Sequence, residues 1–183
     1  MITPAPLPLT PASLPLLFLD VDGPLIPFGA ARGEAPRPRY PVTPAQQDER
    51  LNPLLERIDP AIGPRLAALP CALVWATTWM SDANDCVAPR LGLPRLPMVD
   101  FPEPSEEEVA LTFRAGLHWK TRPLVDWAQG RPFAWVDDEI TERDRTYVEA
   151  SCGPQALLHR VDPATGLTEP DFTVLDHWLR SAA

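Results

Sequence analysis

Five short apolar runs constrain the fold of this chain more than any other feature. They are residues 16–19, 71–76, 96–101, 133–136 and 156–161. Short apolar runs bounded by proline, glycine and polar residues are typical of strands that are buried on both faces. Helical segments separate these runs. The order therefore predicts an α/β fold, with a doubly wound, Rossmann-like parallel sheet of about five strands and helices on both faces.

Helix-start and helix-stop signals fall between the strands. Thr43 before Pro44 predicts a helix start, and two or three short helices are expected between there and Leu69. Gly92 predicts the end of a helix that begins near Trp79.

The second half of the chain carries similar signals. Thr121 is expected to cap a helix, which leaves Lys120 just ahead of it. Thr168 and Asp171 have capping-box spacing and predict the start of a final helix. The acidic run 103–108 fits either a solvated loop or a helix N-terminus.

Two carboxylates follow the first predicted strand. Asp20 and Asp22 are separated by one residue, and Gly23 lets the backbone turn sharply after them. Alternation along an extended chain would point both carboxylates to one side, where a hard cation such as Mg²⁺ would relieve their repulsion. An ordinary strand that ends in an acidic turn explains the same residues without a site.

Polar residues also end two later strands. Thr77 and Thr78 follow run 71–76, and Asp137 and Asp138 follow run 133–136. The threonines suit either helix capping or phosphate binding at a helix N-terminus. In doubly wound sheets, ligands bind at the carboxyl ends of the strands, so these residues are expected to converge with the first pair.

Composition limits the class of protein. The chain has 183 residues and a net charge of -9, which predicts one globular domain over 15–183 and argues against broad binding to nucleic acid. Residues 1–14 are interpreted as a Pro-rich lead-in on the surface, without signal-peptide character. No apolar run is long enough to span a membrane. Three cysteines without CxxC spacing favour reduced thiols and a cytoplasmic location.

Lys120 is the only lysine in a chain with sixteen lysine and arginine residues. Its position just ahead of the fourth apolar run suggests that its ammonium group serves as a point charge at the predicted site. The alternative is an exposed lysine at a helix start.

Together, LFLDVDG, VWATT, the lone Lys120 and WVDDE resemble the four ordered motifs of the haloacid dehalogenase (HAD) superfamily. The motifs span 16–142. The sequences DVDGPL, WATTW and WVDDE further resemble those of the HAD domain of Swiss Army Knife RNA repair proteins. The resemblance implies a magnesium-dependent phosphohydrolase with an aspartate nucleophile.

The resemblance also implies roles for the acids. Asp20 would be the nucleophile that forms an aspartyl phosphate, and Asp22 would be the general acid and base. Mg²⁺ would be held by Asp20, the Asp22 backbone carbonyl and Asp138. Asp137 would lie in an outer shell, and Glu142 could add a contact there.

The remaining roles concern the phosphate. Thr77 would bind the phosphoryl oxygens, although the register could favour Thr78. Lys120 would neutralise their charge, and Gly23 is placed with the substrate-binding residues. Phosphoryl transfer independently needs charge neutralisation on the equatorial oxygens, which a metal and one fixed cation can supply.

The spacing of the motifs leaves no room for a large cap domain. An open site favours an exposed phosphate on a macromolecule, either a nucleic-acid end or a phosphoprotein. One alternative is a small-molecule phosphatase whose loop carrying Arg32, Arg37 and Arg39 acts as a minimal lid; another is a noncatalytic HAD-like binding module. The alternative interpretation of that loop is a solvated surface loop without a role at the site. Oligomeric state is not predicted.

Overall fold

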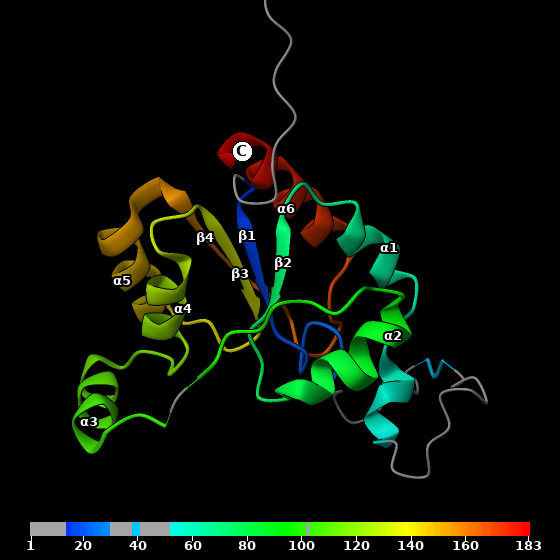
Figure 1. Ribbon diagram of the computed structural model, residues 1–183, viewed down its shortest axis with the longest axis horizontal. Coiled ribbons are helices and arrows are strands. Elements are labelled where there is room, and N and C mark those ends of the chain that lie inside the picture. Colours follow the sequence, from blue (N-terminus) through cyan, green and yellow to red (C-terminus); the bar gives the residue numbers. More distant parts are fainter. Residues whose placement is uncertain (1–13, 30–37, 41–51, 102) are drawn as a thin grey trace, which may run out of the picture.

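Four parallel strands form the centre of the protein (Figure 1). The computed structural model describes residues 14–29, 38–40, 52–101 and 103–183. The strands are β1 (Leu16–Leu19), β2 (Ala72–Trp75), β3 (Phe133–Asp137) and β4 (Ala156–Arg160). Their order is β2-β1-β3-β4, and every neighbouring pair is parallel.

The described helices connect and cover these strands. They are η2 (Pro53–Arg57), α1 (Ile62–Ala67), η3 (Ala83–Val87), α2 (Ala88–Leu91), α3 (Glu106–Ala115), α4 (Thr121–Ala128), α5 (Glu142–Cys152), η4 (Gly153–Gln155) and α6 (Glu169–Ala182). Figure 1 shows α4 and α5 beside one face of the sheet and α1, α2 and α6 beside the other.

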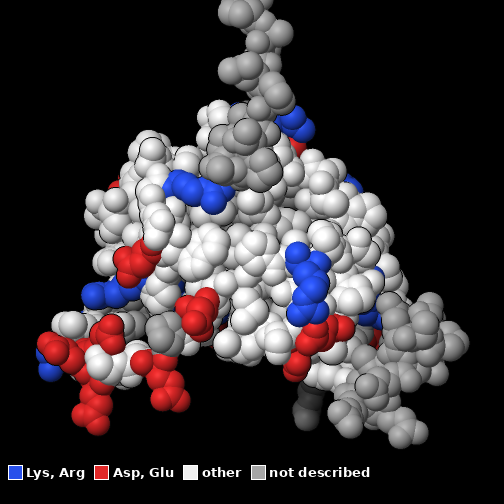
Figure 2. Space-filling view, viewed as in Figure 1, with Lys and Arg blue, Asp and Glu red and all other residues white. Residues whose placement is uncertain are grey.

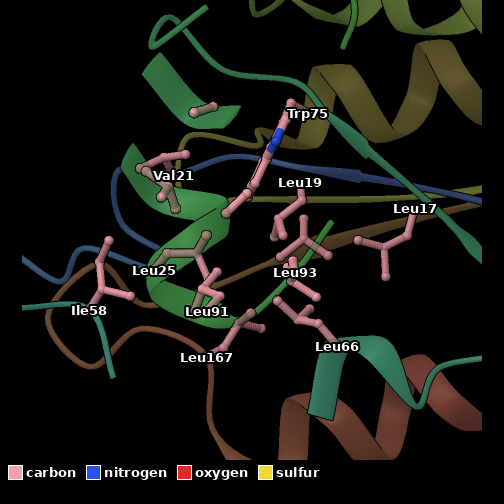
Figure 3. Packing of buried hydrophobic residues seen from close by; sticks show 14 of the residues in the cluster. Leu17, Leu19, Val21, Leu25, Ile58, Leu66, Trp75, Leu91, Leu93 and Leu167 are labelled. Carbon is pink, nitrogen blue, oxygen red and sulfur yellow. The ribbon is translucent and has the colours of Figure 1, made fainter. Parts of the chain in front are cut away.

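Alternate residues of β1 feed two hydrophobic cores. Leu17 and Leu19 pack in the core that contains Leu66 of α1 and Leu91 of α2 (Figure 3). Leu16 and Phe18 instead belong to the core that contains residues of α4 and α5. A strand with both faces buried must be apolar throughout, which is why its sequence does not alternate. The predicted doubly wound α/β fold is confirmed.

The predicted strand at 96–101 is wrong. In the described residues this segment makes one isolated parallel bridge, between Met98 and Trp75 of β2. The Trp75 amide donates to the Pro97 carbonyl at 2.9 Å, and the Val99 amide donates to the Trp75 carbonyl at 2.8 Å. Pro97 has no N–H, so the ladder cannot extend through it. The segment covers an edge of the sheet without becoming a regular strand.

Three of the helix-boundary predictions hold. Gly92 ends α2 with φ 65°, in the left-handed region that glycine tolerates. Thr168 and Asp171 form the predicted capping box. The acidic run is a helix N-terminus, since Ser105 and Glu108 form a capping box at the start of α3.

Other boundary predictions fail or lie outside the described part. Thr121 does not cap α4: it is the first residue of that helix, and its hydroxyl donates to Asp144 at 2.6 Å. Thr43, like Arg32 and Arg37 and most of the lead-in, lies outside the described residues. Among the described helices, none has the length and apolar character needed to cross a membrane.

Candidate active site

The carboxyl ends of β1, β2 and β3 meet at one edge of the sheet. Asp20 follows β1, Thr77 lies just beyond β2, and Asp137 is the last residue of β3. β1 lies between the other two strands, so these three ends are neighbours at the same edge of the sheet. All three residues are buried.

Lys120 joins two of these strands. Its Nζ donates to Oδ2 of Asp20 at 2.7 Å and to Oδ2 of Asp137 at 2.8 Å. The residue is only 3% exposed although it precedes a surface helix. The structure therefore brings the lone lysine to the acids, and an exposed helix-start lysine is excluded.

Three carboxylates lie around this ammonium group. Asp20, Asp137 and Asp138 each offer an oxygen within 4.8 Å of the others. Three buried acids and one lysine leave excess negative charge, and burial makes that charge costly. Oxygen donors with excess negative charge fit a hard divalent cation such as Mg²⁺.

The pKa values reflect this crowding. Burial raises the pKa of Asp20 to about 7, although the charge of Lys120 opposes the rise. Burial, together with the charge of Asp137, also raises the pKa of Asp138. Burial acts to lower the pKa of Lys120, but the charges of Asp20 and Asp137 outweigh it and raise that pKa. The lysine is thus held as a cation, and a second cation would favour ionised acids.

Asp137 is held on both of its oxygens. Oδ2 accepts hydrogen bonds from Lys120 and, at 3.2 Å, from the indole of Trp135. Oδ1 accepts the backbone N–H of Glu139 at 2.9 Å. A carboxylate with these partners is suited to orient the lysine, which is the outer role expected for it.

A tight turn follows the first acid. The Asp20 Oδ1 accepts the N–H of Val21 at 2.8 Å, and the Gly23 N–H donates to the Ile26 carbonyl at 3.1 Å. Asp22 lies in this turn, and its Oδ2 accepts the indole N–H of Trp79 at 2.9 Å. Among the described residues, the Asp22 carboxylate does not cluster with Asp20, Asp137 and Asp138, so it is separate from the three-acid cluster.

Residues 16–172 match the family described as the HAD domain in Swiss Army Knife RNA repair proteins. The chain belongs to this HAD family. The match covers most of the chain and includes each acid of the cluster and Lys120. No curated protein and no solved structure matches the chain. Family membership supports, at a coarse level, a phosphohydrolase of the HAD type.

The two threonines of this HAD domain have different surroundings. Thr77 is buried, and its hydroxyl accepts the N–H of Trp79 at 3.3 Å. Thr78 is exposed. A short turn therefore uses the Thr77 hydroxyl, and Thr77 is the buried one of the two threonines.

The structure does not bring Glu142 to the site of this HAD domain. Its side chain is 91% exposed and pairs with Arg145 of the same helix at 3.3 Å. The first turn of α5 points it into solvent. Asp144, two residues later, is the fully buried acid of that turn.

Sequence reasoning missed Asp144 and His118. Asp144 accepts the N–H of His118 at 2.8 Å and the hydroxyl of Thr121 at 2.6 Å, so it ties the Lys120 segment to α5. His118 Nδ1 accepts the N–H of Lys120 at 3.2 Å, and its Nε2 lies 3.0 Å from Glu139 Oε2. The capping-box spacing of Thr141 and Asp144 could have revealed the acid. No spacing signal in the sequence marks the histidine.

Proposed function

We propose that this HAD domain is a Mg²⁺-dependent phosphomonoester hydrolase that works through an aspartyl phosphate on Asp20. The observation that carries the proposal is the contact of one buried ammonium, Lys120, with Asp20 and Asp137 beside Asp138. A phosphate next to Asp20 would find a nucleophile, a fixed cation and a set of metal-binding oxygens in one place.

The residues fit the metal. Asp20, Asp138 and the backbone carbonyl of Asp22 would hold Mg²⁺, with Asp137 behind them. When bound, the metal would neutralise charge on the phosphoryl oxygens.

The chain's own residues supply the remaining chemistry. A carboxylate oxygen of Asp20 attacks phosphorus, and Asp22 protonates the departing oxygen. Asp22 then takes a proton from the water that hydrolyses the aspartyl phosphate. Lys120 and Thr77 bind the phosphoryl oxygens throughout, with Thr78 as the alternative for the hydroxyl contact.

The substrate proposed is an exposed phosphate on a macromolecule, with a nucleic-acid end preferred. Three observations support this choice. The described segments between the motifs form short helices and loops, and none of them forms a separate cap domain. The family is described from RNA repair proteins. Figure 2 shows acidic side chains over α3, which fits a single terminal phosphate better than a long bound strand.

Hydrolysis of p-nitrophenyl phosphate tests the reaction. We expect turnover with Mg²⁺, none with EDTA, and at least about a thousandfold loss in Asp20→Asn with the fold retained. Asp85→Asn, an exposed acid that pairs with Arg95, is the matched control and should retain activity. Undiminished turnover in Asp20→Asn would remove the mechanism. Absence of turnover in the wild type would favour a noncatalytic binding module.

A substrate panel tests the second part of the proposal. A 3′-phosphorylated oligonucleotide should be hydrolysed with a higher kcat/KM than phosphorylated metabolites or a phosphopeptide. A preference for metabolites would instead indicate a small-molecule phosphatase, and a preference for the peptide would indicate a phosphoprotein substrate.

A further inference from the structure

Trp79 connects two parts of the site that lie far apart in the sequence. Its indole N–H donates to Oδ2 of Asp22 at 2.9 Å, and its backbone N–H donates to the hydroxyl of Thr77 at 3.3 Å. The ring is half-buried and packs against the core that contains Leu19 and Trp75. The indole N–H thus projects from an anchored ring toward the turn after β1.

We propose that Trp79 is a positioning residue that fixes which oxygen of Asp22 carries the transferred proton. The inference rests on the proposed function, in which Asp22 is the general acid and base. An indole N–H can donate a hydrogen bond but cannot accept one. Oδ2 of Asp22 is therefore the acceptor in both protonation states. A carbonyl oxygen accepts a hydrogen bond better than the hydroxyl oxygen of a carboxylic acid, so this bond favours the acid form with its proton on Oδ1.

This assignment specifies the proton's path in both steps. In the first step a bond forms between an Asp20 oxygen and phosphorus, the bond from phosphorus to the leaving oxygen breaks, and the Asp22 Oδ1 proton passes to that oxygen. In the second step water oxygen bonds to phosphorus, the Asp20–phosphorus bond breaks, and a proton of that water returns to Oδ1. Oδ2 keeps its bond to Trp79 throughout.

Trp79 restrains the Asp22 carboxylate. Within the described part of the chain, the indole bond is the hydrogen bond that the Asp22 side chain makes. Asp20, by contrast, has a partner on each oxygen, Val21 on Oδ1 and Lys120 on Oδ2. Loss of the indole N–H should therefore release Asp22 and leave the nucleophile in place.

The test is Trp79→Phe, which keeps an aromatic ring and removes the N–H. Poor leaving groups need protonation as they depart, whereas p-nitrophenolate leaves without it. We expect kcat/KM for ethyl phosphate to fall about 10- to 100-fold and that for p-nitrophenyl phosphate by less than about threefold. The plot of log kcat/KM against leaving-group pKa should become steeper.

Trp127→Phe is the matched control. Trp127 packs against Phe18 in the other core, with ring centroids 5.6 Å apart, and it should leave the ratio between the two substrates unchanged. A purely structural role for Trp79 predicts equal losses on both substrates, and that result overturns the inference, as does an unchanged ratio in Trp79→Phe.

A measurement without turnover tests the contact itself. The indole ¹H–¹⁵N NMR signal that disappears in Trp79→Phe identifies Trp79. It should shift upfield in Asp22→Ala, which removes the acceptor, and an unmoved signal overturns the inference. If the wild type and Asp20→Asn both lack activity, the proposed function fails and the catalytic role of Trp79 fails with it. An active wild type with an unchanged Trp79→Phe ratio overturns the inference alone.

Discussion

At the scale of single residues, Gly23 allows two strand ends to approach each other. Its φ is +83°, and a Cβ at this position would lie 2.6 Å from Cγ of Asp138. Both the backbone conformation and the missing side chain are therefore required. The sequence predicted the sharp turn at Gly23. The approach of Asp138 depends on tertiary distances that the sequence alone does not define.

Gly23→Ala should damage stability and metal binding together. We expect a loss of about 1 to 4 kcal/mol in the free energy of unfolding, because the new methyl group displaces Asp138 and strains the backbone. Mg²⁺ should activate the variant only at higher concentration. Urea denaturation and a Mg²⁺ titration of activity measure the two effects.

Gly130→Ala separates backbone strain from the contact. Gly130 has φ +79° and open space where a Cβ would lie. We expect its variant to lose stability while the Mg²⁺ dependence of activity stays unchanged. Equal metal dependence in the Gly23 and Gly130 variants would contradict the role given to Asp138.

The sequence predicted the acids and the lysine better than their neighbours. Asp20, Lys120 and Asp138 stand at motif positions, and the parallel sheet brings them together. Trp79 and Trp135 lie in or beside the same motifs, but no characteristic sequence spacing predicts the hydrogen bond of an indole. Their partners depend on ring orientation, which packing decides after the strands are paired.

At the scale of elements, one buried acid links α4 and α5. The Asp144 Oδ2 accepts the N–H and hydroxyl of Thr141 at the start of α5, and its Oδ1 accepts the N–H of His118 and the hydroxyl of Thr121 at the start of α4. Burial acts to raise the pKa of Asp144, but the hydrogen bonds from Thr121 and Thr141 outweigh it and hold that pKa below its ordinary value.

Asp144→Asn should therefore destabilise the protein in a pH-dependent way. A depressed folded-state pKa contributes stability above the unfolded pKa of about 3.9, and that contribution is lost as the pH falls through the folded pKa. We expect the variant to be about 1 to 3 kcal/mol less stable than the wild type near neutral pH. The difference should shrink below about pH 4. Urea denaturation across this range is the measurement.

Glu142→Gln is the control on the same helix, since that side chain is exposed. Its effect should stay within about 0.5 kcal/mol at every pH. A constant Asp144→Asn penalty across the pH range would show that its charge is not responsible.

Most elements could be predicted from sequence, and the failures have local causes. The four strands and the cap at Gly92 follow from apolar runs and backbone chemistry that act within a few residues. The segment around Pro97 has strand-like composition, but a missing N–H ends its ladder. Thr121 has the residue type of a cap, yet a partner on α5 takes its hydroxyl.

At the scale of the whole molecule, the site opposes the stability of the fold. Asp138 is buried beside Asp137, and this environment raises its pKa, so its charged form is less favourable here than in water. The acids are retained in spite of this cost, which is expected where acids serve binding or catalysis.

Mg²⁺ should stabilise the folded protein. We expect the melting temperature to rise by about 2 to 8 °C in millimolar Mg²⁺, because the ion binds the folded state. In EDTA, Asp138→Asn should be more stable than the wild type by about 0.5 to 2 kcal/mol. It should also lose most of the Mg²⁺-dependent rise. Thermal unfolding with both proteins, in EDTA and in Mg²⁺, provides the comparison, and an equal Mg²⁺ response would exclude Asp138 as a ligand.

Among the described α-helices, α3 is the one that buries no residue, and Phe113 on it is 83% exposed. Its sequence is consequently free to drift, because the two cores do not depend on it. A descendant of this chain could enlarge the segment into a lid or replace it altogether while the catalytic scaffold persists, so new substrate preferences could evolve here without redesigning the chemistry.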